Sequence, residues 1–382
     1  MNRRLNLLTV PAVLALAVSG CTSNSPSAGG DLTVTSTADK CAVSASSAPS
    51  GTLVFKVTNK GNEITEFYLL AQDGLRIVGE VENITPNLTR DLVVQAPAGQ
   101  YFTSCKPGMV GSGIRSAFTV TDSGKKVEAS GDDKKLVATA TTLYAGYVKD
   151  QTDQLLTKTN QFAALYKAGK FDQARALYAP ARLHWERIET VAESFGDLDP
   201  SMDAREADLE PGQVWTGWHK IEKDLWPPKT GYKPLTAAER TKLADKLVTD
   251  TKTLHTRTRT LTYTVDQIAN GSKGLLDEVA TGKVTGEEEA WSHTDLWDFQ
   301  GNVDGARVGF DNLRPILSKK DPALETSIAT KFTALQKVLD KHKVGDGFKL
   351  YTQLSKGEIK ELSDAVNALS EPLSKLTAAV LK

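Results

Sequence analysis

The hydrophobic pattern of this chain changes its period part-way along, and this change constrains the fold more than any other feature. Apolar and polar residues alternate in the first part, as in the β-branched run Leu53–Thr58 before the turn residues 59–62. From Leu136 onward the apolar spacing is helical, and one helix face collects Phe171, Ala174, Leu177 and Tyr178. We therefore expect an all-β domain followed by an all-α domain.

Turn residues and composition set the expected boundaries. Residues 31–122 should form a β-sandwich, with strands at 53–58, 66–71, 90–95, 99–104 and 116–120. The polar segment 123–135 is expected to be a linker. Residues 136–382 should form a helical bundle, with amphipathic stretches at 236–278, 287–317, 322–342 and 355–381.

The N-terminal residues indicate export. Arg3 and Arg4 precede the apolar run Leu7–Val18, which is too short to span a bilayer. The run leads to Val18-Ser19-Gly20-Cys21, which resembles the site cut by lipoprotein signal peptidase. We expect residues 1–20 to be a signal peptide and Cys21 to be lipidated, with residues 21–30 as a flexible tether at the membrane surface. An ordinary secretory signal with an incidental cysteine is the alternative.

The charge balance excludes one class of partner. The chain has 46 basic and 47 acidic residues, for a net charge of −1. A nucleic-acid-binding protein would carry a marked basic excess, so we expect no nucleic-acid partner.

The cysteines of the β domain leave two uses open. If Cys21 is acylated, Cys41 and Cys105 are the remaining thiols, and an oxidising compartment favours a disulfide between them. The alternative is a second metal site that uses these cysteines with Glu66 and Met109. Segment 101–109 is similar to the loop that closes a cupredoxin site, but all five histidines lie in the helical half, which excludes a blue-copper centre.

Two pairs of metal-ligating residues stand at helical spacing in the second half. Glu186 and Glu189 are three residues apart, and so are His219 and Glu222. On a helix each pair projects from one face, which is how metal-binding bundles supply ligands from facing helices. Each pair alone is also typical of a solvated helix face. The acidic stretch 197–208 lies between the pairs and could supply a further oxygen ligand.

Three segments resemble the imelysin-like (peptidase M75) family: Glu186–Pro200, Gly217–Glu222 and Ser292–Gln300. Together with the β domain they resemble the EfeO-type iron-uptake lipoproteins, which place a cupredoxin-like domain before the imelysin-like domain. The resemblance covers the chain from about residue 31 to its C-terminus. The β domain departs from the cupredoxin pattern in having no histidine, which puts a metal site there in doubt.

This resemblance implies a function and a ligand set. It implies an exported lipoprotein, on the outer face of the membrane or in the periplasm, that captures iron and delivers it to a membrane permease, with a haem peroxidase as a further partner. The iron is expected as Fe³⁺ or Fe²⁺, and copper and zinc are the other metals that the site is expected to accept in vitro. The implied metal ligands are Glu186, Glu189, Asp203, His219 and Glu222, joined from the run 287–289 by Glu288.

Two rival functions need comparison. A zinc peptidase of the His-Glu-x-x-His kind needs a glutamate after the first histidine and a second histidine four residues on. Lys220 and Lys223 hold those positions after His219, so we expect no enzyme. The other rival is a surface lipoprotein that binds glycans without a metal, and the sequence does not exclude it.

Overall fold

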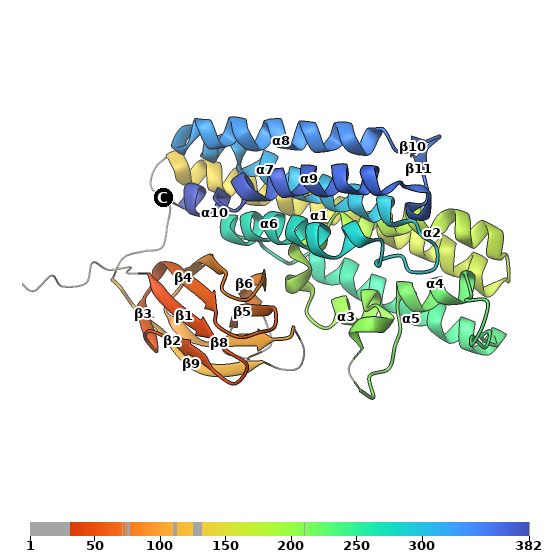
Figure 1. Ribbon diagram of the computed structural model, residues 1–382, viewed down its shortest axis with the longest axis horizontal. Helices are drawn as coiled ribbons and strands as arrows, with labels where there is room; N and C mark the ends of the chain where they lie inside the picture. Colours follow the sequence, from red (N-terminus) through yellow and green to blue (C-terminus); the bar gives the residue numbers. More distant parts are fainter. Residues whose placement is uncertain are drawn as a thin grey trace, which may run out of the picture.

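The computed structural model describes residues 31–70, 72, 74, 77–109, 113–124, 132–209 and 211–381. A β-sandwich is followed by a larger helical domain that lies along one side of it (Figure 1). The predicted fold class, an all-β domain before an all-α domain, is confirmed. The expected signal peptide, Cys21, the tether 21–30 and most of the linker lie outside the described residues.

Nine strands build the β domain within the described residues. They are β1 (Leu32–Ser36), β2 (Cys41–Val43), β3 (Ser47–Pro49), β4 (Gly51–Asn59), β5 (Thr65–Leu70), β6 (Ile77–Ile84), β7 (Thr89–Ala96), β8 (Gly99–Pro107) and β9 (Ile114–Thr121). One sheet has the order β2-β1-β4-β7, and the other has the order β3-β9-β8-β5-β6. The inward faces meet in an apolar core where the rings of Phe67 and Phe118 lie 5.2 and 5.5 Å from that of Phe55.

The five predicted strands are present as β4, β5, β7, β8 and β9, but β1, β2, β3 and β6 were not predicted, and the longest of these is β6. Its pairing with β5 shifts register between Thr65 and Phe67, which is a bulge. Its residue Gly79 has no side chain to show the pattern, and a Cβ there would lie 2.4 Å from Val94. The alternate positions Glu80 and Glu82 face the helical domain instead of the solvent, so the usual contrast of apolar and polar faces is weak.

A disulfide joins Cys41 in β2 to Cys105 in β8 and thereby links the two sheets. Of the two uses considered for these cysteines, the disulfide is therefore the one present in the structure. Glu66 is buried and accepts a hydrogen bond from Tyr68, with the Lys106 ammonium 3.8 Å away. Burial raises the pKa of Glu66, and these two partners only partly oppose it. Met109 lies apart from this pair, on a cleft between the domains.

The helical domain runs from Asp132 to Leu381. Its α-helices are α1 (Asp132–Lys167), α2 (Phe171–Glu186), α3 (Leu198–Asp203), α4 (Trp218–Leu225), α5 (Ala237–Thr258), α6 (Val265–Thr281), α7 (Asp295–Lys320), α8 (Pro322–Asp340), α9 (Lys356–Leu373) and α10 (Leu376–Leu381). Its 3₁₀ turns are η1 (Glu189–Phe195), η2 (Glu206–Asp208), η3 (Lys283–Thr285) and η4 (Tyr351–Gln353). A short hairpin of β10 (Lys343–Val344) and β11 (Gly347–Phe348) follows α8.

Several helix boundaries differ from the prediction. Helix α1 begins at Asp132, inside the expected linker. The stretch 236–278 is two helices, because Thr264 starts α6 with a capping box that it forms with Gln267. In the stretch 287–317 the helix begins only at Asp295, so the acids at 287–289 stand on a loop before it. Within the segment 287–294, the side chains of Glu288, Glu289 and Ser292 are buried in the bundle.

Glycines on α7 let the end of α2 approach that helix closely. A Cβ at Gly301 would lie 2.4 Å from the Cβ of Glu186, and one at Gly305 would lie 2.5 Å from the carbonyl oxygen of Arg187. Any larger residue would push the two elements apart. Gly301 and Gly305 therefore set how closely α2 approaches α7, and with it how deeply the Glu186 carboxylate is buried.

Helix α6 holds the β domain against the bundle (Figure 1). Asn270 donates to the carbonyl oxygen of Val93 over 2.8 Å, and the Gln95 backbone N–H donates to Asp266 over 3.0 Å. Arg90 forms an ion pair with Asp277. Among the helices of the described residues, none has the length and apolar character needed to cross a membrane.

Candidate metal site

Helix α4 places His219 and Glu222 on its buried side. The helix begins after Gly217, which has a φ of 87° and lies so close to Met202 that a Cβ would be 2.1 Å from its carbonyl oxygen. His219 Nδ1 lies 3.3 Å from Glu222 Oε2. Glu222 Oε1 accepts hydrogen bonds from the backbone N–H groups of Trp291, at 3.0 Å, and Ser292, at 2.7 Å. The predicted pair is thus held rigidly inside the protein and is not a solvated helix face.

The other imidazole nitrogen of His219 points at two acids from different elements. Nε2 lies 3.5 Å from Asp203 Oδ1 at the end of α3 and 3.6 Å from Glu288 Oε1 on the loop before α7. It is buried and has no hydrogen-bond partner among the described residues. Ligand atoms of Asp203, His219 and Glu288 lie within 4.8 Å of one another, as do those of His219, Glu222 and Glu289.

Glu186 and Glu189 complete the set of predicted residues. The expectation that both stand on one helix is wrong, because α2 ends at Glu186 and Glu189 begins η1. Their carboxylates nevertheless meet: Lys283 Nζ lies 2.8 Å from Glu186 and 2.9 Å from Glu189, and Asn302 donates to both over 2.8 Å. Glu186, Glu189 and Asp203 form a third group within 4.8 Å. All six predicted ligands therefore belong to one cluster.

Arg182, which was not predicted, lies at the centre of this cluster. Its guanidinium is fully buried and forms ion pairs with Glu186, Asp203, Glu288, Glu289 and Asp298. The contact with Glu289 is 2.7 Å long and the contact with Glu288 is 3.4 Å long. A planar guanidinium with five N–H donors suits such a ring of oxygens.

Carboxylates outnumber cations in this interior. Eight acids lie within ion-pair distance of Arg182, Lys283 or His219: Glu186, Glu189, Asp203, Glu222, Glu278, Glu288, Glu289 and Asp298. Arg205 is a third permanent cation, 3.3 Å from Glu288, so if all eight acids were ionised, five negative charges would remain without balance. Such an excess cannot persist in a buried site, so protons or a metal cation must supply the rest.

The pKa values divide these acids into two kinds. Burial acts against ionisation of Glu288, but Lys283, His219 and Arg182 outweigh it and hold its pKa well below the usual range. For Glu189 burial and the Glu186 charge raise the pKa well above the usual range, and for Glu289 burial and the Glu222 charge do the same. The surroundings thus favour the ionised form of Glu288 and the protonated forms of Glu189 and Glu289.

His219 takes part in this balance as a cation. Burial and the Arg182 charge lower its pKa, but the close contacts with the Glu222 and Glu288 carboxylates and the Asp203 charge outweigh them and raise it to about 9. A metal at Nε2 would have to displace this proton, and the freed acids would then become ligands.

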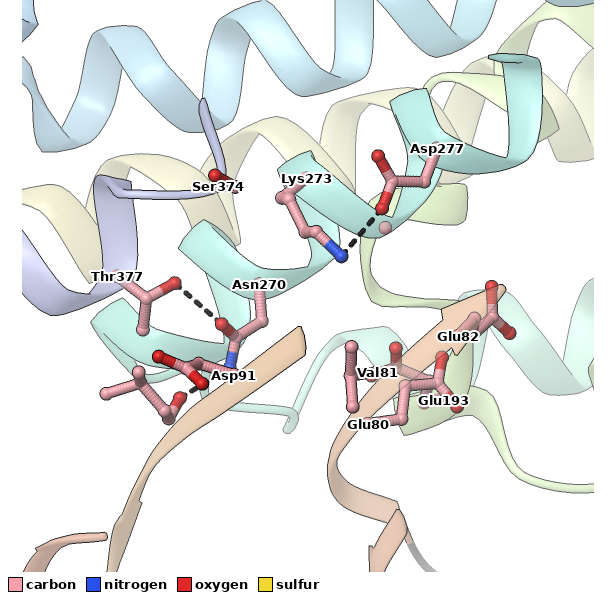
Figure 2. A pocket seen from close by; sticks show the side chains of 12 residues that line it. Glu80, Val81, Glu82, Asp91, Glu193, Asn270, Lys273, Asp277, Ser374 and Thr377 are labelled. Atoms are coloured by element: carbon pink, nitrogen blue, oxygen red, sulfur yellow. Dashed lines mark hydrogen bonds and ion pairs between the residues drawn. The ribbon is translucent and has the colours of Figure 1, made fainter. Parts of the chain in front are cut away.

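A cleft of about 1210 Å³ between the two domains leads to the cluster. At its inner end lie Glu189, Asp203 and Glu288, and acids also line its outer part: Glu80, Glu82, Glu193, Asp199 and Glu278. Figure 2 shows Glu80 and Glu82 on β6 beside Glu193, while Lys273 turns away to form a 2.6 Å ion pair with Asp277. Burial raises the pKa of Asp199 to about 7. The approach to the site is therefore an acidic, water-filled passage.

Of the residues considered for a second site, none joins this cluster. The three groups of candidate ligands that the described residues form all lie in the helical domain, and Cys41 and Cys105 are bonded to each other.

Comparisons with known proteins agree with this architecture. The profile of the imelysin (peptidase M75) family matches residues 140–376. The "Iron uptake system component EfeO" of Escherichia coli O6:K15:H31 is 35% identical over 379 residues, which covers 98% of each chain. The chain belongs to the EfeO family. An "Efem/EfeO family lipoprotein" of Staphylococcus haemolyticus is 45% identical over 252 residues, 65% of this chain and 86% of that protein.

A solved structure shares the fold of the helical part. The protein assigned as an iron-regulated protein A precursor from Parabacteroides distasonis superposes with a TM-score of 0.50 at 15% identity, over 67% of this chain and 97% of that chain. In the EfeO-family chain of Figure 1, the segment 140–376 that the imelysin profile matches contains the whole cluster described above. The β-sandwich lies outside that segment. Its described residues line part of the cleft, but none of them belongs to the three groups of candidate ligands.

Proposed function

We propose that this protein is an exported, lipid-anchored component of an iron-uptake system, and that it binds iron in the cluster around His219 and passes it to a membrane permease. Its full-length EfeO relative bears the name of an iron-uptake component, which supports the role in uptake. The name of the staphylococcal relative supports the lipid anchor, for which Cys21 is the expected site. A haem peroxidase is the further partner that we expect in such a system.

One observation carries the proposal for iron. His219 Nε2 is buried without a hydrogen-bond partner among the described residues, and it faces Asp203 and Glu288. The carboxylates suit a hard cation such as ferric iron, and an imidazole beside carboxylates also suits ferrous iron. The acids around it carry negative charge that the nearby cations do not balance, and an incoming metal cation would neutralise part of that charge.

The structure offers little for hydrolysis. On α4 the positions that a zinc peptidase would need are held by Lys220, whose ammonium lies 4.6 Å from the Trp215 ring, and Lys223, which pairs with Glu206. Both point away from the cluster. We therefore propose a binding protein and not an enzyme.

Iron binding by matched histidine variants tests this proposal. We expect the mature protein to bind ferrous iron saturably under anaerobic conditions in isothermal titration calorimetry, and His219→Gln to weaken binding about 100-fold through the loss of one ligand. The control is His255→Gln, because His255 is a half-buried partner of Asp153 on α5, outside the cluster. No saturable binding by the wild type would contradict the proposal and favour a metal-independent surface protein.

A further inference from the structure

Lys283 is a buried cation inside the cluster, and a site that only binds a metal does not require one. Its ammonium is completely buried, and it lies 2.8 Å from Glu186, 2.9 Å from Glu189, 3.8 Å from Glu288 and 3.9 Å from Glu278. Four carboxylates therefore surround this one buried ammonium group. The side chain thus occupies a cation position inside the acidic interior.

The backbone holds Lys283 firmly in this place. It stands on η3 between Gly282 and Gly286. Gly286 has a φ of 76° and lies against the Tyr351 ring, where a Cβ would be 2.3 Å from a ring carbon. The hydroxyl of Tyr351 donates to the carbonyl oxygen of Val284. These contacts prevent η3 from moving away, so Lys283 has no free path out of the cluster.

Lys283 shares its acids with the candidate metal position. Glu288 Oε1 lies 3.8 Å from Lys283 Nζ and 3.6 Å from His219 Nε2. Glu186 joins Lys283 to the other buried cation, with Oε1 paired to Arg182 and Oε2 to Lys283. A metal held by His219, Asp203 and Glu288 would therefore lie a few ångströms from a permanent positive charge.

We infer that Lys283 is a built-in counter-ion that keeps metal binding reversible: it stabilises the metal-free acids, repels the bound ion and so limits the affinity of the site. This inference rests on the proposed function. It assigns a reason for a buried lysine in a cation site, since a protein that must release its cargo gains from a weaker hold. A charge that close to a buried ion changes binding by more than a factor of ten even at an effective dielectric constant of about 20.

The test compares Lys283→Met with a lysine control. We expect Lys283→Met to bind ferrous iron, measured anaerobically by competition with a chelator, at least about tenfold more tightly than the wild type, and to release it correspondingly more slowly. Zn²⁺ serves as a redox-inert second probe. The control is Lys273→Met, since Lys273 lies beside the cleft and pairs with Asp277 but does not contact the cluster. It should change the affinity by about twofold or less, as expected for a more distant, better-solvated charge.

A second pair covers the case in which Lys283→Met does not fold. The double variant Lys283→Met/Glu189→Gln removes the ammonium together with one of its carboxyl partners and is compared with Glu189→Gln alone. The double variant should again bind more tightly. Equal or weaker binding without the lysine, in folded protein, would overturn the inference. If the wild type itself bound no iron, the proposed function would fail instead, so the two failures are distinguishable.

Discussion

In the β-sandwich the buried side chains are apolar or uncharged apart from Glu66, which is the one buried acid among the described residues of that domain. In the helical domain the centre of the bundle contains Arg182, Lys283, His219 and a ring of buried carboxylates. The first interior is stabilised by apolar burial and a disulfide, whereas the second depends on charges that must match. The comparison separates a domain whose interior needs no further charge from one whose buried charges a bound cation would help to balance.

The largest expected effect follows from removing the central cation of the helical domain. Arg182→Met should lower the free energy of unfolding by about 5 kcal/mol, because five buried carboxylates lose their partner. Chemical denaturation followed by far-UV circular dichroism measures this change. The control is Arg307→Met, whose half-exposed partner Asp311 lies 3.7 Å away, with an expected change below about 1 kcal/mol. A small loss for Arg182→Met would mean that the cluster is not strongly charged.

The β domain should respond to a different change. Replacing both Cys41 and Cys105 with Ala should destabilise that domain by about 4 kcal/mol, since the bridge closes a loop with a sequence separation of 64 residues. Iron binding by the helices should survive. Thiol titration of the unreduced wild type and calorimetry of the variant check both parts. Two titratable thiols, or loss of iron binding in the folded variant, would erase the distinction between the domains.

The pH dependence should separate loading from folding. His219 has its pKa raised to about 9, so the metal-free protein carries its proton at neutral pH. Its contribution to stability is fully present below the ordinary value near 6.5 and is lost as the pH rises through 9. Metal binding needs the neutral imidazole and should run the opposite way. Affinity for ferrous iron should fall by up to about tenfold, or ~1.4 kcal/mol, for each pH unit between 8 and 6.

Anaerobic titrations at several pH values measure this slope. His219→Gln provides the control, because its residual binding should lose most of the slope that the imidazole causes. An unchanged affinity of the wild type between pH 6 and 8 would remove His219 from the ligand set.

Local spacing was enough to predict part of the site. His219 and Glu222 lie on one short helix, so their separation of three residues already places them together. Arg182 was missed although it stands four residues before Glu186 on α2, so helical spacing already places the two side chains together. Lys283 could not be predicted in this way, because it reaches the cluster from η3, about a hundred residues further along the sequence. Glu289 was considered only as one of three adjacent acids, and the sequence cannot show which of them turns inward. The loop 287–294 decides this, and it was expected to be helical.

The same limit applies to the fold. The alternating strands and the amphipathic helices follow from local pattern, so the order of the two domains was predictable. Strand β6 was not, since Glu80 and Glu82 face another domain and Gly79 makes room for Val94. Contacts between domains have no period in the sequence, and the acidic wall of the cleft depends on them.

The size of the cleft has a consequence for the speed of loading. At the density of liquid water its 1210 Å³ would hold about 40 water molecules. An arriving ion can therefore travel through it with its hydration shell intact, drawn inward by acids that it does not yet touch. Under the proposed function, protein ligands replace that shell only at Asp203, Glu288 and His219. Dehydration is confined to the last few ångströms of the path, so the exchange of water for protein ligands there should set the pace.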